Sequence, residues 1–461
     1  MRWGTLGNLA LFGAVAAFNA VVLPWIGASD SQFHLRYAEA IYNGELPSGG
    51  STVAAHPPLY YAIIAGLVGQ FLAVDAIPIS AAIVRSFNIV LGCGLVVVLA
   101  WAGWRIVNVR KAQFAIALPA LSVLITPFVR VAGDVYNDTL ATLLASAALA
   151  LSIVLLRDGP RRHLVILLAC VSVIGMATRS TFVVTLGLAM ISIVVAYLLH
   201  GRGSLGHRFV RGFTPVAIVV AIVIATSGWF YLLNLERSGS WFRSRPQAPF
   251  AGRDYKSLGD NLSNPDYYLV PITRLLGFRD WQGFFPFNGM ISALVSVICL
   301  AGVLWWLLER SRWRSLLSAP GDRAVVALLA VQLAGLYAMQ LQHATGWGNI
   351  NLRYFLPGLI VFGIILTVGS LAWPRLRGQL AVTVMAVLAA GAVLDVAWFA
   401  TPKVGEASAQ NPLSYVSTAV ANNAIPFVLV PLLFGAMLAG LVIVAASLFV
   451  ATRPVSPAPG R

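Results

Sequence analysis

Acidic residues carry most of the information about chemistry in this sequence because they are scarce: 16 Asp and Glu among 461 residues. Asp30 follows the first apolar stretch, and His34 comes four residues later. If a helix begins at Asp30, the carboxylate and the imidazole share one of its faces. A carboxylate at such a boundary can take a proton from a hydroxyl nucleophile or hold a cation. The alternative is that Asp30 only caps the helix and that His34 lies on the surface.

A second acidic pair, Asp134 and Asp138, lies in the sequence GDVYND at the start of the fourth apolar stretch. One of the two is expected to cap the following helix. The distribution of basic residues, described below, predicts a topology in which this pair and Asp30 lie at the same membrane face. Two carboxylate sites far apart in the sequence therefore favour a common site for proton transfer or cation binding.

Basic and aromatic residues are expected at that same face. Arg353 and Tyr354 begin the tenth apolar stretch, where a cation breaks the charge rule locally. A guanidinium at this level can grip a phosphate with two hydrogen bonds, although snorkelling to lipid headgroups explains it as well. His56 opens the segment HPPLYY, in which Tyr60 suits a membrane interface. His56 by itself indicates little.

The segment 235–286 is long, basic and aromatic, and Arg274 and Arg279 are among its cations. Loops of this length are usually functional or disordered. Its composition suits an anionic lipid-linked donor or a sugar. Contact with lipid headgroups is the alternative for any single residue.

The composition indicates that these elements belong to a chain surrounded by lipid. The chain is 59% hydrophobic and 10% charged, with a mean hydropathy of +0.83, whereas soluble domains carry about 25% charged residues. Lysines and arginines number 31, but they lie mainly in short loops between apolar stretches, which is typical of membrane topology and not of nucleic-acid binding. The three cysteines lie inside apolar stretches and predict packing, not a disulfide framework.

Twelve apolar stretches of about spanning length are predicted, with both termini cytoplasmic. They lie near 6–26, 80–104, 113–130, 137–156, 163–178, 180–199, 213–234, 287–308, 324–342, 354–372, 379–400 and 425–451.

A further stretch, 58–74, decides the topology. If it does not cross, the internal basic clusters, such as Arg157/Arg161/Arg162, all lie on the side of Met1, as the positive-inside rule requires. The fold class is therefore an all-α polytopic membrane protein with one transmembrane domain, 1–452. Its first outer loop, 27–79, carries juxtamembrane helices, 235–286 is a long outer loop, and 453–461 is a disordered cytoplasmic tail.

Taken together, these motifs resemble the GT-C superfamily of membrane glycosyltransferases, which use polyprenyl-phosphate sugars. The likeness is to the protein O-mannosyltransferase and lipid A aminoarabinose transferase branches. It rests on DSQFHLRYAEAIYNGELP from Asp30, on HPPLYY, on NDTL around Asp138 and on RYFLP from Arg353. It covers mainly residues 1–160 and this late segment. The chain departs from the family in having Ser31 after the first acid, and His56 where the aminoarabinose branch has lysine.

The resemblance implies a hexosyl- or pentosyltransferase in the bacterial inner or plasma membrane, with an extracytoplasmic active site. Asp30 would deprotonate the acceptor, which could be a lipid, a glycan or a protein. Arg353, with Arg274 or Arg279, would stabilise the departing polyprenyl phosphate. Asp138, with Asp134 as substitute, would orient the acceptor, or Asp30 and Asp138 would hold a divalent cation such as Mg or Mn. His34, His56, Tyr60 and Tyr354 complete the predicted substrate site.

Three other classes of function stay open at this stage. A transporter usually places its substrate near the bilayer midplane, on broken helices arranged in repeats. Here the few ionisable residues inside the spans, Arg85, Arg179 and Asp395, lie toward the predicted outer ends. A non-catalytic scaffold would not explain the cluster of outer motifs, whereas a polysaccharide polymerase of the cell envelope shares most of these features.

Overall fold

The computed structural model describes residues 1–24, 30–47, 51, 53–107, 110–243, 254–277, 288–309, 318–373, 375–404, 412–423 and 425–452. Within these ranges the chain is about 82% helical, without any strand, and a lone β-bridge joins Lys256 to Gly346. The all-α fold that the sequence predicts is therefore confirmed for the part of the chain that the structure describes.

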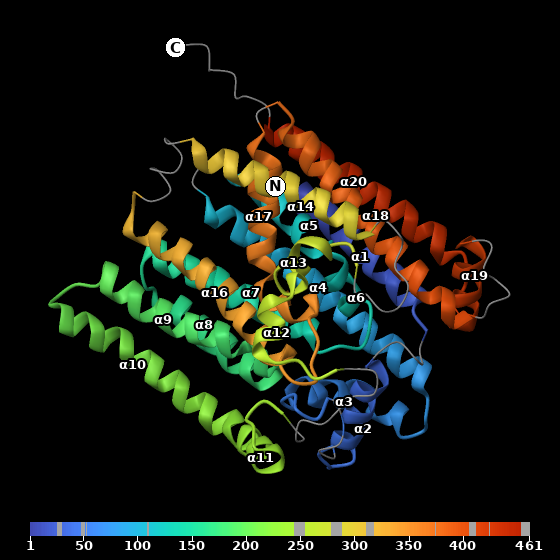
Figure 1. Ribbon diagram of the computed structural model, residues 1–461, viewed down its shortest axis with the longest axis horizontal. Coiled ribbons are helices and arrows are strands. Elements are labelled where there is room, and N and C mark those ends of the chain that lie inside the picture. The colour runs from blue at the N-terminus through green and yellow to red at the C-terminus, as the bar shows by residue number, and fades with distance from the viewer. Residues whose placement is uncertain are drawn as a thin grey trace.

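Ten spans in the described residues are long and apolar enough to cross a membrane. They are α1 (Arg2–Val22), α4 (Ile77–Ile106), α7 (Asp138–Asp158), η1 (Ser180–Phe182) with α9 (Val183–His200), α10 (Leu205–Val223) with η2 (Ile224–Gly228) and α11 (Trp229–Ser238), α14 (Asn288–Leu308), α16 (Pro320–Ala344), η3 (Leu352–Gly358) with α17 (Leu359–Ala372), α18 (Arg377–Val404) and α20 (Leu429–Thr452). Figure 1 shows most of these helices running in roughly the same direction.

Two of the twelve predicted stretches do not form one of the ten long helices. The stretch 113–130 forms α5 (Lys111–Val123) and α6 (Thr126–Ala132), which are bent by 72°. Pro127 explains the break, because proline suits the first turn of a new helix and cannot continue the preceding one. The stretch 163–178 forms α8 (Arg162–Thr178), which at 17 residues is shorter than the spanning helices.

Five further helices are shorter than the spans. They are α2 (Ser31–Tyr42), α3 (Leu59–Leu72), α12 (Leu258–Ser263), α13 (Pro265–Thr273) and α19 (Pro412–Asn422). Helix α3 has 14 residues, which is too short to cross a bilayer. It packs on α2 and α4 at one end of the bundle (Figure 1). This placement agrees with the predicted non-crossing helix at 58–74.

Helix α7 lies at the centre of the bundle, with 89% of its span buried by α4, α8, α9, α16 and other neighbours. Close packing brings the backbones together: a Cβ on Gly133, just before α7, would lie 2.8 Å from the carbonyl oxygen of Ala16 on α1. Small residues allow such approaches between helices in lipid. The amino-terminal end of α7 is thereby fixed against α1.

The opposite end of α7 collects basic residues. Arg157 donates to the carbonyl oxygens of Arg105 and Ile106 and pairs with Asp322 at 2.8 Å. His200 contacts the carbonyl oxygen of Leu156 at this same end. The positive-inside rule assigns this basic cluster to the cytoplasm. The predicted acidic motifs lie at the other end of the same helix.

Candidate active site

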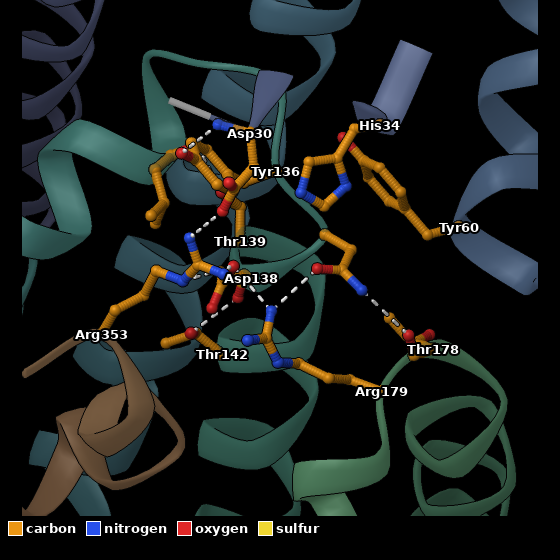
Figure 2. Close-up of polar contacts among 12 residues, drawn as sticks. Asp30, His34, Tyr60, Tyr136, Asp138, Thr139, Thr142, Thr178, Arg179 and Arg353 are labelled. Atoms are coloured by element: carbon orange, nitrogen blue, oxygen red, sulfur yellow. Dashed lines mark hydrogen bonds and ion pairs between the residues drawn. The ribbon is translucent and has the colours of Figure 1, made fainter. Parts of the chain in front are cut away.

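Three charged residues from distant parts of the sequence meet at the amino-terminal end of α7. The Nη1 atom of Arg353 donates to Oδ2 of Asp30 over 3.1 Å, across 323 residues of sequence. The Nε atom of the same guanidinium lies 3.5 Å from Oδ2 of Asp138. Figure 2 shows the guanidinium between the two carboxylates. One cation is thus shared by both predicted acids.

Asp138 contacts a second cation as well. The Nη1 atom of Arg179, which directly follows α8, lies 2.6 Å from Oδ2 of Asp138 and donates to Oδ1 of Asn137 over 2.8 Å (Figure 2). Both side chains of this ion pair are 2% exposed. The site therefore contains an alternating chain of charges in the order Arg179, Asp138, Arg353, Asp30.

Asp30 stands at the N-cap position of α2, but its side chain makes no capping hydrogen bond. Its carboxylate turns to Arg353 instead, and 31% of the side chain is exposed. The backbone amide of Asp30 donates to the hydroxyl of Tyr136 over 3.3 Å. The alternative in which Asp30 only caps the helix does not describe this geometry, and the exposed fraction leaves the carboxylate within reach of a substrate.

Arg353 is held by the short helix η3 and its neighbours. The side chain of Asn351 accepts from the backbone amide of Arg353 over 2.9 Å. Gln340 on α16 donates to the carbonyl oxygen of Asn349 and accepts from the amide of Asn351. The guanidinium also lies 4.8 Å from the ring centroid of Tyr136, a distance typical of a cation–π contact. Arg353 is therefore a positioned residue, and not a cation that snorkels to the surface.

His34 lies on the other side of α2 from solvent, 1% exposed, and the alternative that places it on the surface is wrong. Its Nδ1 atom is 2.8 Å from the hydroxyl of Tyr61, and its ring packs edge-on to Tyr136 at 5.1 Å. Burial lowers the pKa of His34 to about 3, although the charge of Asp30 acts in the opposite direction. The ring of His56 stacks parallel to that of His34 at 6.2 Å. Burial likewise lowers the pKa of His56 well below its usual value, so both imidazoles are neutral at pH 7.

Asp134 is fully buried in a separate network. Its Oδ1 atom accepts from the hydroxyl of Ser31 over 2.7 Å and from the backbone amide of Val135 over 2.8 Å, and it pairs with Arg85 at 3.4 Å. Arg85 also donates to backbone carbonyl oxygens after α1. These contacts join α1, α2, α4 and the start of α7, so Asp134 connects the elements that carry the site.

The remaining predicted residues lie at varying distances from this centre. Tyr60 is buried and donates to Oδ1 of Asn88, which supports the Asp134 turn. The ring of Tyr354 lies 5.7 Å from the guanidinium carbon of Arg353. Arg274 contacts the carbonyl oxygen of Ile350 at 3.5 Å and the carboxylate of Asp266 at 3.9 Å. Arg279 lies outside the described residues.

A divalent cation does not fit between Asp30 and Asp138 as they are arranged. The guanidinium of Arg353 contacts both carboxylates, so it already supplies the positive charge there. Within the described ranges, no three His, Cys, Asp or Glu side chains converge as metal ligands. The chemistry of the site is therefore argued from its own charged side chains.

Sequence reasoning did not assign Arg179, Tyr136 or Asn137 to the site. Arg179 carried a usable signal, because it is a cation at the predicted outer end of an apolar stretch, as is Arg353. Tyr136 and Asn137 lie between the two acids of GDVYND and had no signal of their own. Their roles depend on the sharp turn that precedes α7.

The fold and the site define an all-α polytopic membrane protein with buried, paired charges at one end of its bundle. No family model matches the sequence, and neither does any curated protein. Among the solved structures that resemble the fold are two of one protein. They are crystal structures of ArnT from Cupriavidus metallidurans, a GT-C aminoarabinose transferase, bound to undecaprenyl phosphate and in the apo state.

The ArnT structure with undecaprenyl phosphate is 16% identical to this chain, with a TM-score of 0.47, over 96% of this chain and 75% of that one. The apo structure is 17% identical, with a TM-score of 0.45, over 95% and 73%. At such values, the function of this chain has to be argued from its own residues.

Proposed function

We propose that this protein is a membrane glycosyltransferase that moves a sugar from a polyprenyl-phosphate donor to an acceptor hydroxyl at the extracytoplasmic face. The observation that carries the proposal is the contact of Arg353 with both Asp30 and Asp138. A partly exposed carboxylate beside a fixed guanidinium provides a proton acceptor and a phosphate-binding cation within one site. Displacement of a sugar from a phosphate needs both.

The reaction is a direct displacement at the anomeric carbon of the sugar. Asp30 takes the proton of the acceptor hydroxyl as the new bond forms between the acceptor oxygen and the anomeric carbon. The bond from that carbon to the phosphate oxygen breaks, and its electron pair leaves on the phosphate. Arg353 faces this growing negative charge, which is the position in which a preorganised cation lowers the barrier most.

Asp138 supports the reaction by positioning Arg353. It is 2% exposed, and its Oδ2 atom contacts two guanidinium groups. A buried carboxylate of this kind fixes the orientation of the arginine that it pairs with. The resemblance implies that Asp138 orients the acceptor. The burial of Asp138 beside two guanidinium groups is less compatible with that role.

The place of the site at the end of the bundle suits a lipid-linked donor. The polyprenyl tail can stay in the bilayer while the sugar meets its acceptor at the interface. The basic cluster around Arg157, at the other end of α7, supports the assignment of the site to the extracytoplasmic face. A site near the midplane, which a transporter would favour, has no counterpart in the contacts around Arg353.

Transfer by the purified full-length protein from a panel of polyprenyl-phosphate sugars tests the proposal. We expect Asp30→Asn to lower the rate by about 100- to 10,000-fold and Arg353→Gln by about 100-fold or more. Asp322→Asn, which breaks an Asp–Arg pair at the other end of α7, is the matched control and should keep the wild-type rate. Wild-type transfer by folded Asp30→Asn, or no transfer from any such donor, would contradict the proposal.

A further inference from the structure

Arg353 has two carboxylate partners that differ in accessibility. Asp138 is 2% exposed and also pairs with Arg179, whereas Asp30 is 31% exposed and contacts the outer nitrogen of the guanidinium. Of the two carboxylates, only that of Asp30 is partly exposed, so the contact between Asp30 and Arg353 is the more accessible one. An incoming anion would therefore replace Asp30 at Nη1 of Arg353 and leave Asp138 in place.

The proposed function gives these two residues conflicting tasks in this arrangement. Asp30 has to accept a proton, but an adjacent guanidinium stabilises the charged carboxylate and makes it a poorer base. Arg353 has to bind a phosphate, but its Nη1 hydrogen bond already goes to Asp30. Both conflicts disappear when a phosphate takes the place of the Asp30 carboxylate on Arg353.

We propose that Asp30 and the donor phosphate compete for Arg353, so that donor binding displaces Asp30 from the guanidinium and thereby activates it as the base. This inference rests on the proposed function and adds its regulation. A phosphate has the geometry to win the competition, because it can engage a guanidinium with two parallel hydrogen bonds, whereas Asp30 contacts this guanidinium through Nη1. The acceptor is then deprotonated only when a donor is in place, so the donor binds first.

Competition between Asp30 and the phosphate for Arg353 predicts a result that a role of Asp30 as a base alone does not predict. Removing the negative charge of Asp30 should lower the transfer rate strongly and at the same time strengthen binding of the lipid phosphate. The probe is undecaprenyl phosphate without a sugar, titrated against the purified full-length protein in detergent. We expect Asp30→Asn to bind it about tenfold more tightly than the wild type, because a charged hydrogen bond no longer has to be broken first.

Three comparisons make the outcome decisive. Asp322→Asn removes a carboxylate from an Asp–Arg pair of 2.8 Å at the opposite end of α7 and should bind the probe as the wild type does. Arg353→Gln should bind it at least tenfold more weakly. If Asp30→Asn does not fold, as judged by its melting temperature, Asp30→Ser provides the same test.

The failures of the two proposals are distinguishable. Unchanged or weaker binding by folded Asp30→Asn or Asp30→Ser, together with weak binding by Arg353→Gln, overturns the competition and leaves the phosphate-binding role of Arg353 intact. Wild-type binding by Arg353→Gln overturns that role itself, and with it the proposed function. Tighter binding by an Asp30 variant that transfers no sugar supports both.

Discussion

The guanidinium of Arg179 lies 2.6 Å from the carboxylate of Asp138, with both side chains buried at the start of α7. Asp138 occupies the first turn of that helix, where a negative charge is also favoured by the helix dipole. Since Asp138 contacts Arg353 as well, Arg179 is coupled to the exposed end of the charge chain through a single carboxylate. A change at Arg179 should therefore alter the position of the reacting groups, although Arg179 contacts neither Asp30 nor Arg353 in this arrangement of charges.

Replacement of Arg179 tests this coupling. We expect Arg179→Gln to destabilise the protein by about 3 kcal/mol, because it breaks a buried ion pair, and to lower the transfer rate through misplacement of Arg353. Arg179→Lys keeps the charge but not the planar guanidinium whose Nη1 atom reaches both Asp138 and Asn137, so it should be intermediate in both respects. Melting temperature in detergent and initial rates measure the effects, and wild-type values for Arg179→Gln would refute the coupling.

Gln340 is expected to control the position of Arg353 from α16. Gln340→Leu removes the hydrogen bonds to Asn349 and Asn351, which precede Arg353 in the chain. We expect a fall in transfer rate of about tenfold or more, since small misplacements of catalytic groups are costly. Gln113→Leu is the matched control, because Gln113 is also buried and donates to a backbone carbonyl oxygen, that of Ala451, at the other end of the bundle. Equal effects of the two changes on rate would argue against a positioning role for Gln340.

The helices of this protein could be predicted from its sequence because apolar length is a strong signal. Each predicted stretch corresponds to one continuous helix or, at 113–130, to two, and the charge rule distinguishes 58–74 from the spans. The bend at Pro127 was missed because the apolar stretch 113–130 continues through it. The hydropathy of this stretch is uniform, whereas the break arises from the effect of proline on the backbone, which hydropathy does not report.

The candidate site could be predicted only in part. Asp30, Asp138 and Arg353 stood out because each is a charge at the edge of an apolar stretch. Their mutual contacts depend on how α2, α7 and η3 pack, which no local pattern encodes. Asp134 and Asp138 had similar local sequences, and only the structure distinguishes their roles. Asp134 pairs with Arg85 in a fully buried network, whereas Asp138 pairs with Arg353.

Buried neutral histidines should make the protein less stable in acid. His34 has a lowered pKa of about 3 in the folded state, against about 6.5 when unfolded. Between these values the unfolded chain binds a proton that the folded chain does not, so stability is lost as the pH falls below about 6.5. At pH 5 the loss due to His34 is about 2 kcal/mol, and His56 acts in the same direction.

The change His34→Gln isolates this contribution. Its melting temperature in detergent should fall less than that of the wild type when the pH is lowered from 7 to 5, even if it starts lower because the contact with Tyr61 is altered. His163→Gln is the control, because it replaces an exposed histidine at the other end of the bundle. Parallel profiles for the wild type and His34→Gln would mean that His34 is protonated in the folded protein.

The side of the membrane that the site faces can be determined by labelling. Glu45 follows α2 near the site, and Arg202 follows α9 near the basic end, and both are exposed. In a background with Cys93, Cys170 and Cys299 replaced by alanine, an impermeant maleimide should label Glu45→Cys in intact cells and Arg202→Cys only after permeabilisation. The reverse pattern would place Asp30 and Arg353 in the cytoplasm, where an acceptor arriving from outside could not reach them. Labelling of both in intact cells would show that the two ends do not lie on opposite sides of the bilayer, and the charge argument for the orientation would then be wrong.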